Sequence, residues 1–519
     1  MDKGLAKEKI MLRYISCGFI FVLAYLFAVS VSAASIAHKQ YASIKDFLAG
    51  QRVIRIIADD TSGYGLQVAS MNLMTTLRQL GFNGKFEFIY STRVTDKITT
   101  LFDLPHHIPD VYEDTKDGIQ FVSLNEFIQR HKNNTASHYT LAMTGGMDTG
   151  PCGLAARSNI DIYHNMGKID CVNHANFFDT TVFAQLVTFY KYPNFIYVAN
   201  NANYELFRQM GSTNKFITAP ITTLHEAKRY LQHDARGQVL SKQKPALAPF
   251  IKGMEKQRYN VLPIYGITLQ ANCRNGKHIG CFPGNILQII AGARYAQLNG
   301  PKSFHKPLII TVFYDYENEA KQIMQLLHKD HWDQYEIPGA MQARKTLNDL
   351  GVPGALSIAN ISDPNTIHII HDVKPGQIVL LWLGPLPKKI FDGLYNYTHP
   401  NIWPQIREGN NSFASLILTG RSHIRCGNKW ELGDTFMTDP QLKIKFAALY
   451  NERGLCRGMT TWNENTNLYQ ELGNMFIAAN DLQSPLSRYF TVIRKNITDP
   501  KNDRLHYALQ EVLRIVNTF

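Results

Sequence analysis

Short apolar runs rich in β-branched and aromatic residues alternate along this chain with segments of helical periodicity. The run Val53–Ala58 precedes a segment in which Leu66, Ala69 and Leu73 recur at spacings of three and four, the pattern of one helix face. Parallel strands need helical crossovers, so repeated strand–helix units predict an α/β fold with a mainly parallel sheet. Further strands are expected at 86–90, 139–143, 195–199, 307–313, 366–370 and 377–383, and further helices at 286–296 and 320–327.

The alternation stops and restarts once. A polar, less regular stretch at 234–257 separates two halves, and apolar residues share one helical face near the end of the chain. We therefore expect two Rossmann-like α/β domains, residues 34–250 and 251–490, followed by a C-terminal helix at 491–519.

The N-terminus has the pattern of an export signal. Residues 14–37 carry no charged side chain, four basic residues precede them, and small residues lead up to Ala33. This pattern predicts a signal peptide at 1–33, cut after Ala33. The run is also long enough to span a bilayer as an uncleaved anchor. Both alternatives predict an exported or membrane-anchored protein, with any membrane association made through residues 14–37.

The charge balance is basic but dispersed. The formal net charge is +12, and no dense block of lysine and arginine occurs. Nucleic-acid binding requires a clustered basic stripe. The composition therefore argues against nucleic-acid binding and favours an anionic ligand or surface.

Six cysteines remain outside the signal segment, an even number that is compatible with disulfides in an exported chain. Pairing of sequence neighbours would join Cys152 to Cys171, Cys273 to Cys281, and Cys426 to Cys456. Other connectivities stay open, as do free buried cysteines.

The first strand leads through Gly63, Tyr64 and Gly65 into a helix. Glycines let the backbone approach a ligand, and the helix N-terminus presents free N–H groups. A dinucleotide fingerprint would need glycine where Val68 stands. The remaining interpretations are a tight structural turn and a loop that binds an acceptor or sugar, with Gln67 beside it.

A second junction follows the strand at 377–383. It contains Gly384 and Lys388, and a later segment runs from Arg407 through Glu408 to Ser412. Glu408 can accept both hydroxyls of a ribose, and Asn411 and Ser412 are good N-caps that would turn backbone N–H groups toward a diphosphate. An ordinary capped helix is the alternative.

These two loops and the two-halves layout resemble the GT-B-type glycosyltransferases. The resemblance implies two domains facing across a cleft, a nucleotide sugar held by the second domain, and a glycan, lipid or protein acceptor held by the first. Basic side chains and a helix N-terminus would offset the diphosphate charge without a metal or other cofactor. The implied donor-binding residues are Gly384, Lys388, Arg407, Glu408, Gly409, Asn410, Asn411 and Ser412, and the acceptor loop contains Gly63, Tyr64, Gly65 and Gln67.

Acidic residues near these loops are candidates for proton transfer. Asp148, in a glycine-rich loop after a strand, or Asp60 could deprotonate an acceptor hydroxyl. Aspartate at such positions is more often a turn residue. Asp315 and Glu317 follow another strand, where helix capping is a simpler explanation than metal binding.

Two other functional classes fit the same layout, namely a two-lobed extracytoplasmic solute-binding protein and a catalytically silent adaptor or effector. Solute-binding proteins usually cross between lobes two or three times. The glycosyltransferase interpretation instead expects one main crossover and a returning C-terminal helix.

Overall fold

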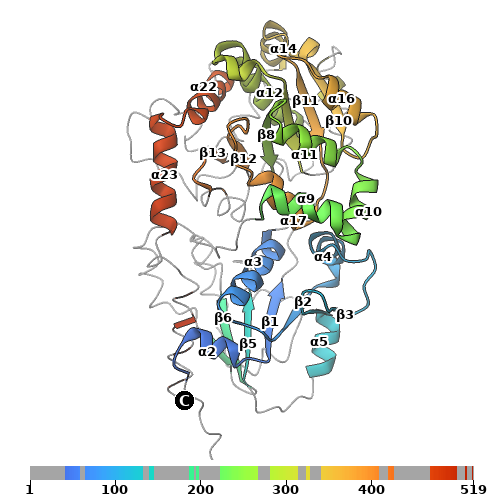
Figure 1. The fold of residues 1–519 in the computed structure, drawn as a ribbon, viewed down its shortest axis with the longest axis vertical. Coiled ribbons are helices and arrows are strands. Elements are labelled where there is room, and N and C mark those ends of the chain that lie inside the picture. The colour runs from blue at the N-terminus through green and yellow to red at the C-terminus, as the bar shows by residue number, and fades with distance from the viewer. Residues whose placement is uncertain are drawn as a thin grey trace, which may run out of the picture.

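The computed structural model of the chain describes residues 41–58, 65–131, 139–144, 186–191, 195–197, 222–266, 281–313, 323–325, 327, 340–407, 416, 419–425 and 468–498, and five positions between 506 and 517. These residues form two α/β domains stacked along the long axis of the molecule (Figure 1). The predicted α/β class with parallel sheets is confirmed.

The first domain is built on a seven-stranded sheet of order β3-β4-β2-β1-β5-β6-β7. Its central strands β4, β2, β1 and β5 are parallel, and β3, β6 and β7 pair antiparallel at the edges. Its core holds a cluster of phenylalanine side chains, among them Phe88, Phe102 and Phe121. The elements are α2 (Ile44–Ala49), β1 (Val53–Ala58), α3 (Gly65–Gln79), β2 (Lys85–Tyr90), η1 (Thr92–Val94), α4 (Thr95–Phe102), β3 (Val111–Asp114), β4 (Ile119–Ser123), α5 (Leu124–His131), β5 (Tyr139–Thr144), β6 (Leu186–Lys191) and β7 (Phe195–Tyr197).

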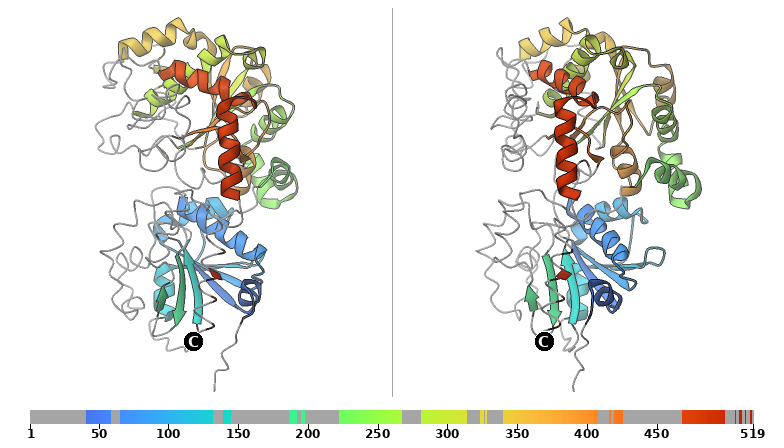
Figure 2. Two further views of the ribbon diagram at one scale, coloured as in Figure 1. Left: turned by 90° about the vertical axis from the view of Figure 1, so that its left-hand side faces the viewer. Right: turned by 60° about the vertical axis from the view of Figure 1, so that its left-hand side comes forward.

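The second domain is built on a parallel six-stranded sheet of order β10-β11-β9-β8-β12-β13. Figure 2 shows helices on both of its faces. The elements are α9 (Leu224–His233), α10 (Ala235–Gln243), α11 (Leu247–Glu255), β8 (Asn260–Tyr265), α12 (Cys281–Asn299), η3 (Lys302–His305), β9 (Leu308–Val312), α14 (Ala340–Asp349), α15 (Val352–Ala355), β10 (Leu356–Asn360), α16 (Thr366–Asp372), β11 (Ile378–Trp382), α17 (Lys388–Tyr395), β12 (Gln405–Arg407), β13 (His423–Arg425), α22 (Leu468–Asn480) and α23 (Pro485–Thr498).

Successive residues of the central strands enter different cores. Leu308 and Ile310 of β9 pack in a cluster with α12 and α22, whereas Ile309 packs in a cluster with α9, α11 and α17. Burial on both faces explains why these strands are continuous apolar runs.

The chain path is simple. Every described strand of the first sheet precedes residue 198, and every described strand of the second follows residue 259. The chain then returns to the first domain, because Leu509 packs in the first core and the Asn517 amide forms two hydrogen bonds of 3.0 Å with the backbone of Tyr41. Among the described residues this path has the one main crossover and the C-terminal return that the glycosyltransferase interpretation expects.

One expected strand is wrong. Residues 366–370 belong to helix α16, in which Thr366 and Ile370, one turn apart, are buried. The strands β10 and β11 on either side are parallel neighbours, and a parallel pair requires a crossover connection. This tertiary requirement overrides the β-branched composition of the segment.

The stretch at 234–257, expected to be an irregular connection, contains helices α10 and α11. Buried side chains of α9, α10 and α11 pack with Val261 and Ile309 of the second sheet. These three helices therefore pack with the second domain. Residue 250, the expected domain boundary, lies inside α11.

The expected signal segment, residues 1–33, lies outside the described residues, as do residues 34–37. Within the part of the chain that the structure describes, no helix has the length and apolarity needed to cross a bilayer.

Candidate functional site

The first sheet reverses its strand order between β1 and β5. From β1 the chain adds β2 and β4 on one side and then places β5 on the other. Open α/β sheets bind ligands at the carboxyl edge of such a switch point. Asp60, Gly63 and Tyr64 follow β1, and Asp148 follows β5; all four lie outside the described residues.

The second sheet has its own reversal, between β8 and β12. Arg407 at the end of β12 pairs with Tyr265 at the end of β8. The segment Glu408–Ser412 directly follows Arg407 and lies outside the described residues. Arg407, the last described residue before this segment, therefore lies at the carboxyl edge of the second switch point.

Arg407 itself belongs to the core. Its side chain is fully buried beside Tyr395 and His423. Burial, together with the nearby Arg407 charge, holds the pKa of His423 well below its usual value. Burial also raises the pKa of Tyr395. The Arg407 side chain is therefore not exposed to a ligand in this structure.

Lys388 lies at another place on the same edge. It begins α17, and its ammonium group forms an ion pair with Asp392 one turn later. The strand before it, β11, is separated from β12 by β9 and β8, so three strand spacings, about 14 Å, lie between them. Lys388 and Arg407 therefore do not converge on one point.

Gly384 lies near the start of the connection between β11 and α17. Its φ of +64° lies in the left-handed region, and a Cβ there would be 3.1 Å from the Lys244 Nζ. That ammonium group donates a hydrogen bond of 2.8 Å to the carbonyl of Leu383. Glycine is the residue that this backbone conformation favours.

Two residues of the predicted acceptor loop are described. Gly65 is the first residue of α3, and Gln67, in the first turn of that helix, is fully buried. Neither residue lines the pocket that lies between the two domains.

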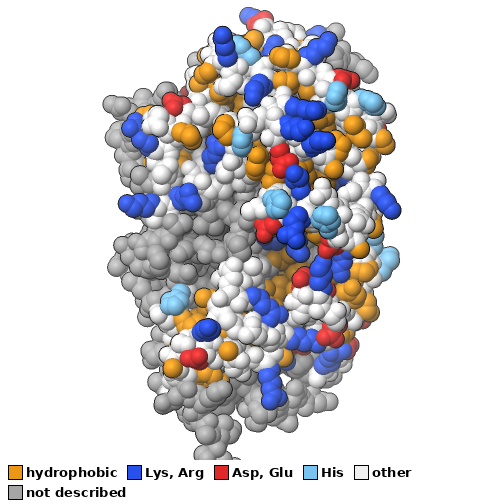
Figure 3. Space-filling view, viewed as in Figure 1, with side chains coloured by type: hydrophobic (Ala, Val, Ile, Leu, Met, Phe, Trp, Pro, Cys, Tyr) orange, Lys and Arg blue, Asp and Glu red, His pale blue; other side chains and the backbone are white. Residues whose placement is uncertain are grey.

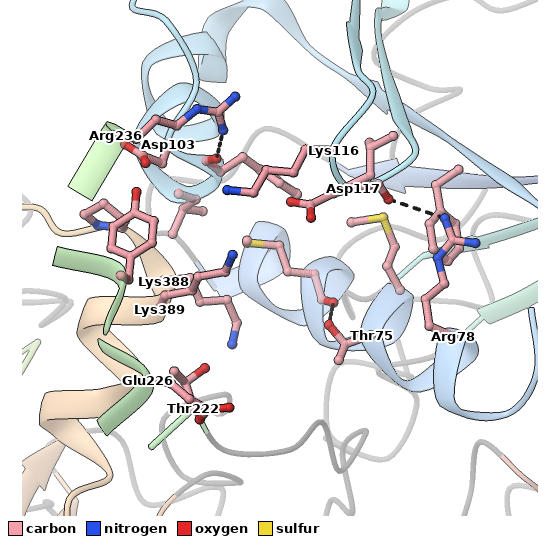
Figure 4. Close-up of a pocket in the computed structure, with 18 residues that line it drawn as sticks. Thr75, Arg78, Asp103, Lys116, Asp117, Thr222, Glu226, Arg236, Lys388 and Lys389 are labelled. Carbon is pink, nitrogen blue, oxygen red and sulfur yellow. Dashed lines mark hydrogen bonds between the residues drawn. The ribbon is translucent and has the colours of Figure 1, made fainter. Parts of the chain in front are cut away.

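The sequence did not indicate a pocket of about 360 Å³ between the domains. The first domain contributes α3, the end of α4 and the β3–β4 turn, and the second contributes α9, Arg236 and the start of α17. Figure 1 shows α3 beneath α9 and α17, and Figure 4 shows Lys388 and Lys389 extending from α17 toward α3. The only sequence signal is Pro387-Lys388-Lys389 in the loop that follows the strand β11, because the other walls come from distant segments.

Charged contacts cross the domain junction beside this pocket. Lys116 of the β3–β4 turn forms an ion pair with Asp234, the N-cap of α10. Arg236 lies 3.8 Å from the Asp114 carboxylate and donates a 3.4 Å hydrogen bond to the carbonyl of Phe102.

Asp103, the residue after α4, faces the same junction. Burial raises the pKa of its carboxyl group to about 6, with Arg236 opposing the shift and Asp234 adding to it. Asp103 also has a left-handed backbone, with φ of +54°.

The predicted disulfides, and the acidic pair considered for metal binding or helix capping, lie almost entirely outside the described residues. Among the described residues no group of three or more His, Cys, Asp or Glu side chains could hold a metal ion. Asp315 and Glu317 lie outside that part of the chain, and so do Cys152, Cys171, Cys273, Cys426 and Cys456. Cys281 is the first residue of α12.

Basic side chains on the face shown in Figure 3 are scattered among acidic and histidine side chains. They form no continuous stripe on this face, which is the feature that tracking a nucleic-acid backbone would need.

No protein-family model matches this chain, and no curated protein matches it. Among solved structures, α,α-trehalose-6-phosphate synthase from Burkholderia multivorans is 8% identical with a TM-score of 0.30, over 90% of this chain and 98% of that one. An α,α-trehalose-phosphate synthase (UDP-forming) from Burkholderia vietnamiensis is 8% identical with a TM-score of 0.30, over 90% and 99% of the two chains. Superpositions this loose support no inference about fold or activity.

Proposed function

We propose that this protein is a GT-B-type glycosyltransferase that moves a sugar from a nucleotide-activated donor to an acceptor. The observation that carries the proposal is the chain path: the described strands of each sheet come wholly from one half of the chain, and the C-terminal segment returns to the first domain. Each half thereby has its own switch point, one for each of two substrates.

In this proposal the donor binds at the carboxyl edge of β8 and β12. The carboxylate of Glu408 accepts hydrogen bonds from the ribose hydroxyls, and the backbone N–H groups at Asn411 and Ser412 bind the diphosphate. Arg407 contributes from behind this edge as a buried positive charge, which acts more strongly at low dielectric than an exposed one.

The acceptor binds at the carboxyl edge of β1 and β5. Asp148 or Asp60 takes the proton from the acceptor hydroxyl as its oxygen forms a bond to the anomeric carbon. The bond between that carbon and the diphosphate oxygen breaks, and the nucleoside diphosphate leaves with the electron pair. Fixed N–H groups and positive charge at the donor loop stabilise the charge that develops.

We also propose that the protein acts after export or while anchored through residues 14–37. The sequence pattern of the N-terminus supports this, and the same setting favours oxidation of Cys273 and Cys281. The nucleotide sugar must then be present in the compartment to which the protein is exported, or at the place to which the protein is delivered.

The alternatives are weakened by the same chain path. A solute-binding protein that crosses two or three times would place strands from both halves in one lobe, whereas none of the described strands is exchanged. A catalytically silent adaptor would not need two sheet edges that bind substrates. An activity assay distinguishes it from the enzyme.

The test is a thermal-shift screen of the chain lacking residues 1–33 against a panel of nucleotide sugars, followed by an assay for nucleoside diphosphate release. A specific donor stabilises the fold by mass action. We expect one nucleotide to raise Tm in wild type, in Asp60→Asn and in Asp148→Asn, and one of the two variants to lose turnover. Stabilisation by a free sugar but by no nucleotide sugar would favour the solute-binding alternative.

A further inference from the structure

The pocket between the domains combines an apolar floor with a cationic rim. Met71, Met74, Leu101, Phe102, Phe86 and Ile119 supply apolar lining. Among the described lining residues, five are lysine or arginine and three are acidic. At about 360 Å³ the pocket falls in the size range of small-molecule sites.

Most of the charges that line the pocket already have partners. Lys116 pairs with Asp234, Lys388 with Asp392, and Arg236 with Asp114. Glu226 accepts hydrogen bonds from the backbone and side chain of Thr223 as part of a helix cap. Asp117 lies beside Arg78, and Asp103 lies beside Arg236 (Figure 4).

Lys389 is different. It is exposed and forms no ion pair with any described residue. Its Nζ lies 5.7 Å from the ring centroid of Tyr230, which also lines the pocket. This ammonium group is therefore available to a ligand.

The hydroxyl of Tyr230 is the second group in the pocket that is available to a ligand. Only 8% of this residue is exposed, and its hydroxyl oxygen has no hydrogen-bond partner among the described residues. Leaving a buried polar group without a partner is costly, so such groups are nearly always satisfied by protein, water or a ligand. The Tyr230 phenol and the Lys389 ammonium group both line the pocket, and each can donate a hydrogen bond to an anionic oxygen.

We propose that this pocket binds a small organic anion whose phosphate or carboxylate head contacts Lys389 and the Tyr230 hydroxyl and whose apolar body covers Met71, Met74 and Leu101. The site lies beyond the proposed donor edge, because Lys389 follows β11 and the donor edge lies at β8 and β12. The ligand would touch both domains and so bind more tightly when they are in contact.

The test is isothermal titration of the chain lacking residues 1–33 with n-octyl phosphate, octanoate, n-octanol and inorganic phosphate. We expect octyl phosphate or octanoate to bind at least about tenfold more tightly than either n-octanol or inorganic phosphate, because only the first two use both parts of the pocket. The tighter of these two identifies the head group.

Two variants assign the site. Lys389→Gln should weaken binding by roughly tenfold or more, since it removes a charge-assisted contact. Tyr230→Phe should weaken it by roughly threefold to tenfold without loss of stability, because it deletes a hydroxyl that has no hydrogen-bond partner among the described residues. Lys252→Gln, which removes an exposed charge outside the pocket, is the matched control. Failure of every probe to bind, equal binding of n-octanol, or the same affinity in Lys389→Gln and Lys252→Gln would overturn the proposal.

Discussion

The ammonium group of Lys116, in the β3–β4 turn of the first domain, donates a hydrogen bond to the carboxylate of Asp234 at the start of α10 in the second. The two residues are 118 positions apart in sequence. Asp234 also accepts a 3.0 Å hydrogen bond from the Arg236 backbone as the helix N-cap. One carboxylate therefore both starts a helix and joins the two domains.

We expect this pair to contribute a small, salt-sensitive coupling. The side chains are 50% and 21% exposed, so the coupling free energy should be about 0.2–1 kcal/mol. A double-mutant cycle with Lys116→Met and Asp234→Asn measures it by urea unfolding, since asparagine keeps the N-cap. The coupling should fall at high ionic strength. A large coupling that is indifferent to salt would show that the pair is more strongly desolvated than its exposure indicates.

Asp103 should make stability depend on pH. The pKa of its carboxyl group is raised from 3.8 to about 6, mainly by burial, so between these values the folded state binds a proton that the unfolded state does not. Stability therefore falls as pH rises through this window, and the full cost remains above pH 6. Asp103→Asn removes the charge and tolerates the left-handed backbone.

Calorimetry of wild type and Asp103→Asn across this pH range checks the expectation. The variant should have the higher Tm at pH 7.5, and the difference should shrink toward zero near pH 4. A pH-independent difference would mean that the Asp103 carboxyl group does not titrate in this window.

Helix α22 should depend on a close contact between two glycines. A Cβ at Gly473 would lie 2.5 Å from the Tyr295 Cδ1 and 2.8 Å from the carbonyl oxygen of Gly292. Gly473→Ala should therefore lower the free energy of unfolding by about 1–3 kcal/mol, as overpacking does. Gly354→Ala in α15 has no atom within 4 Å of the added Cβ and should be neutral or slightly stabilising. Equal effects of the two substitutions in urea unfolding would contradict this packing.

The positions of several strands could be predicted from the sequence. The strands β9 and β11 are apolar runs buried on both faces, and such runs are visible without any tertiary information. The segment 366–370 shares that composition, yet its position between two parallel strands makes it a helix. Only the pairing of those strands distinguishes the cases.

The candidate site likewise has parts that local sequence patterns indicate and parts that only the tertiary structure brings together. The sequence predicted candidate loops at 63–67 and 407–412 from local patterns, and most of their residues lie outside the described part of the chain. The interdomain pocket could not be predicted in this way, because it brings Met74 and Lys116 of one domain to Lys389 of the other. Likewise, no periodicity showed that Arg407 would be buried against His423 rather than exposed at the edge.

Nucleotide recognition at Glu408 tests the central claim most directly. Isothermal titration of nucleotide sugars and the matching free sugars into wild type, Glu408→Ala and Asp372→Ala measures it, with the exposed Asp372 carboxylate as control. We predict that one nucleotide sugar binds wild type and Asp372→Ala equally, that Glu408→Ala binds it at least about tenfold more weakly, and that the unliganded Tm of Glu408→Ala stays near wild type. Binding that survives in Glu408→Ala, or tight binding of a free sugar with none of its nucleotide form, would contradict the account.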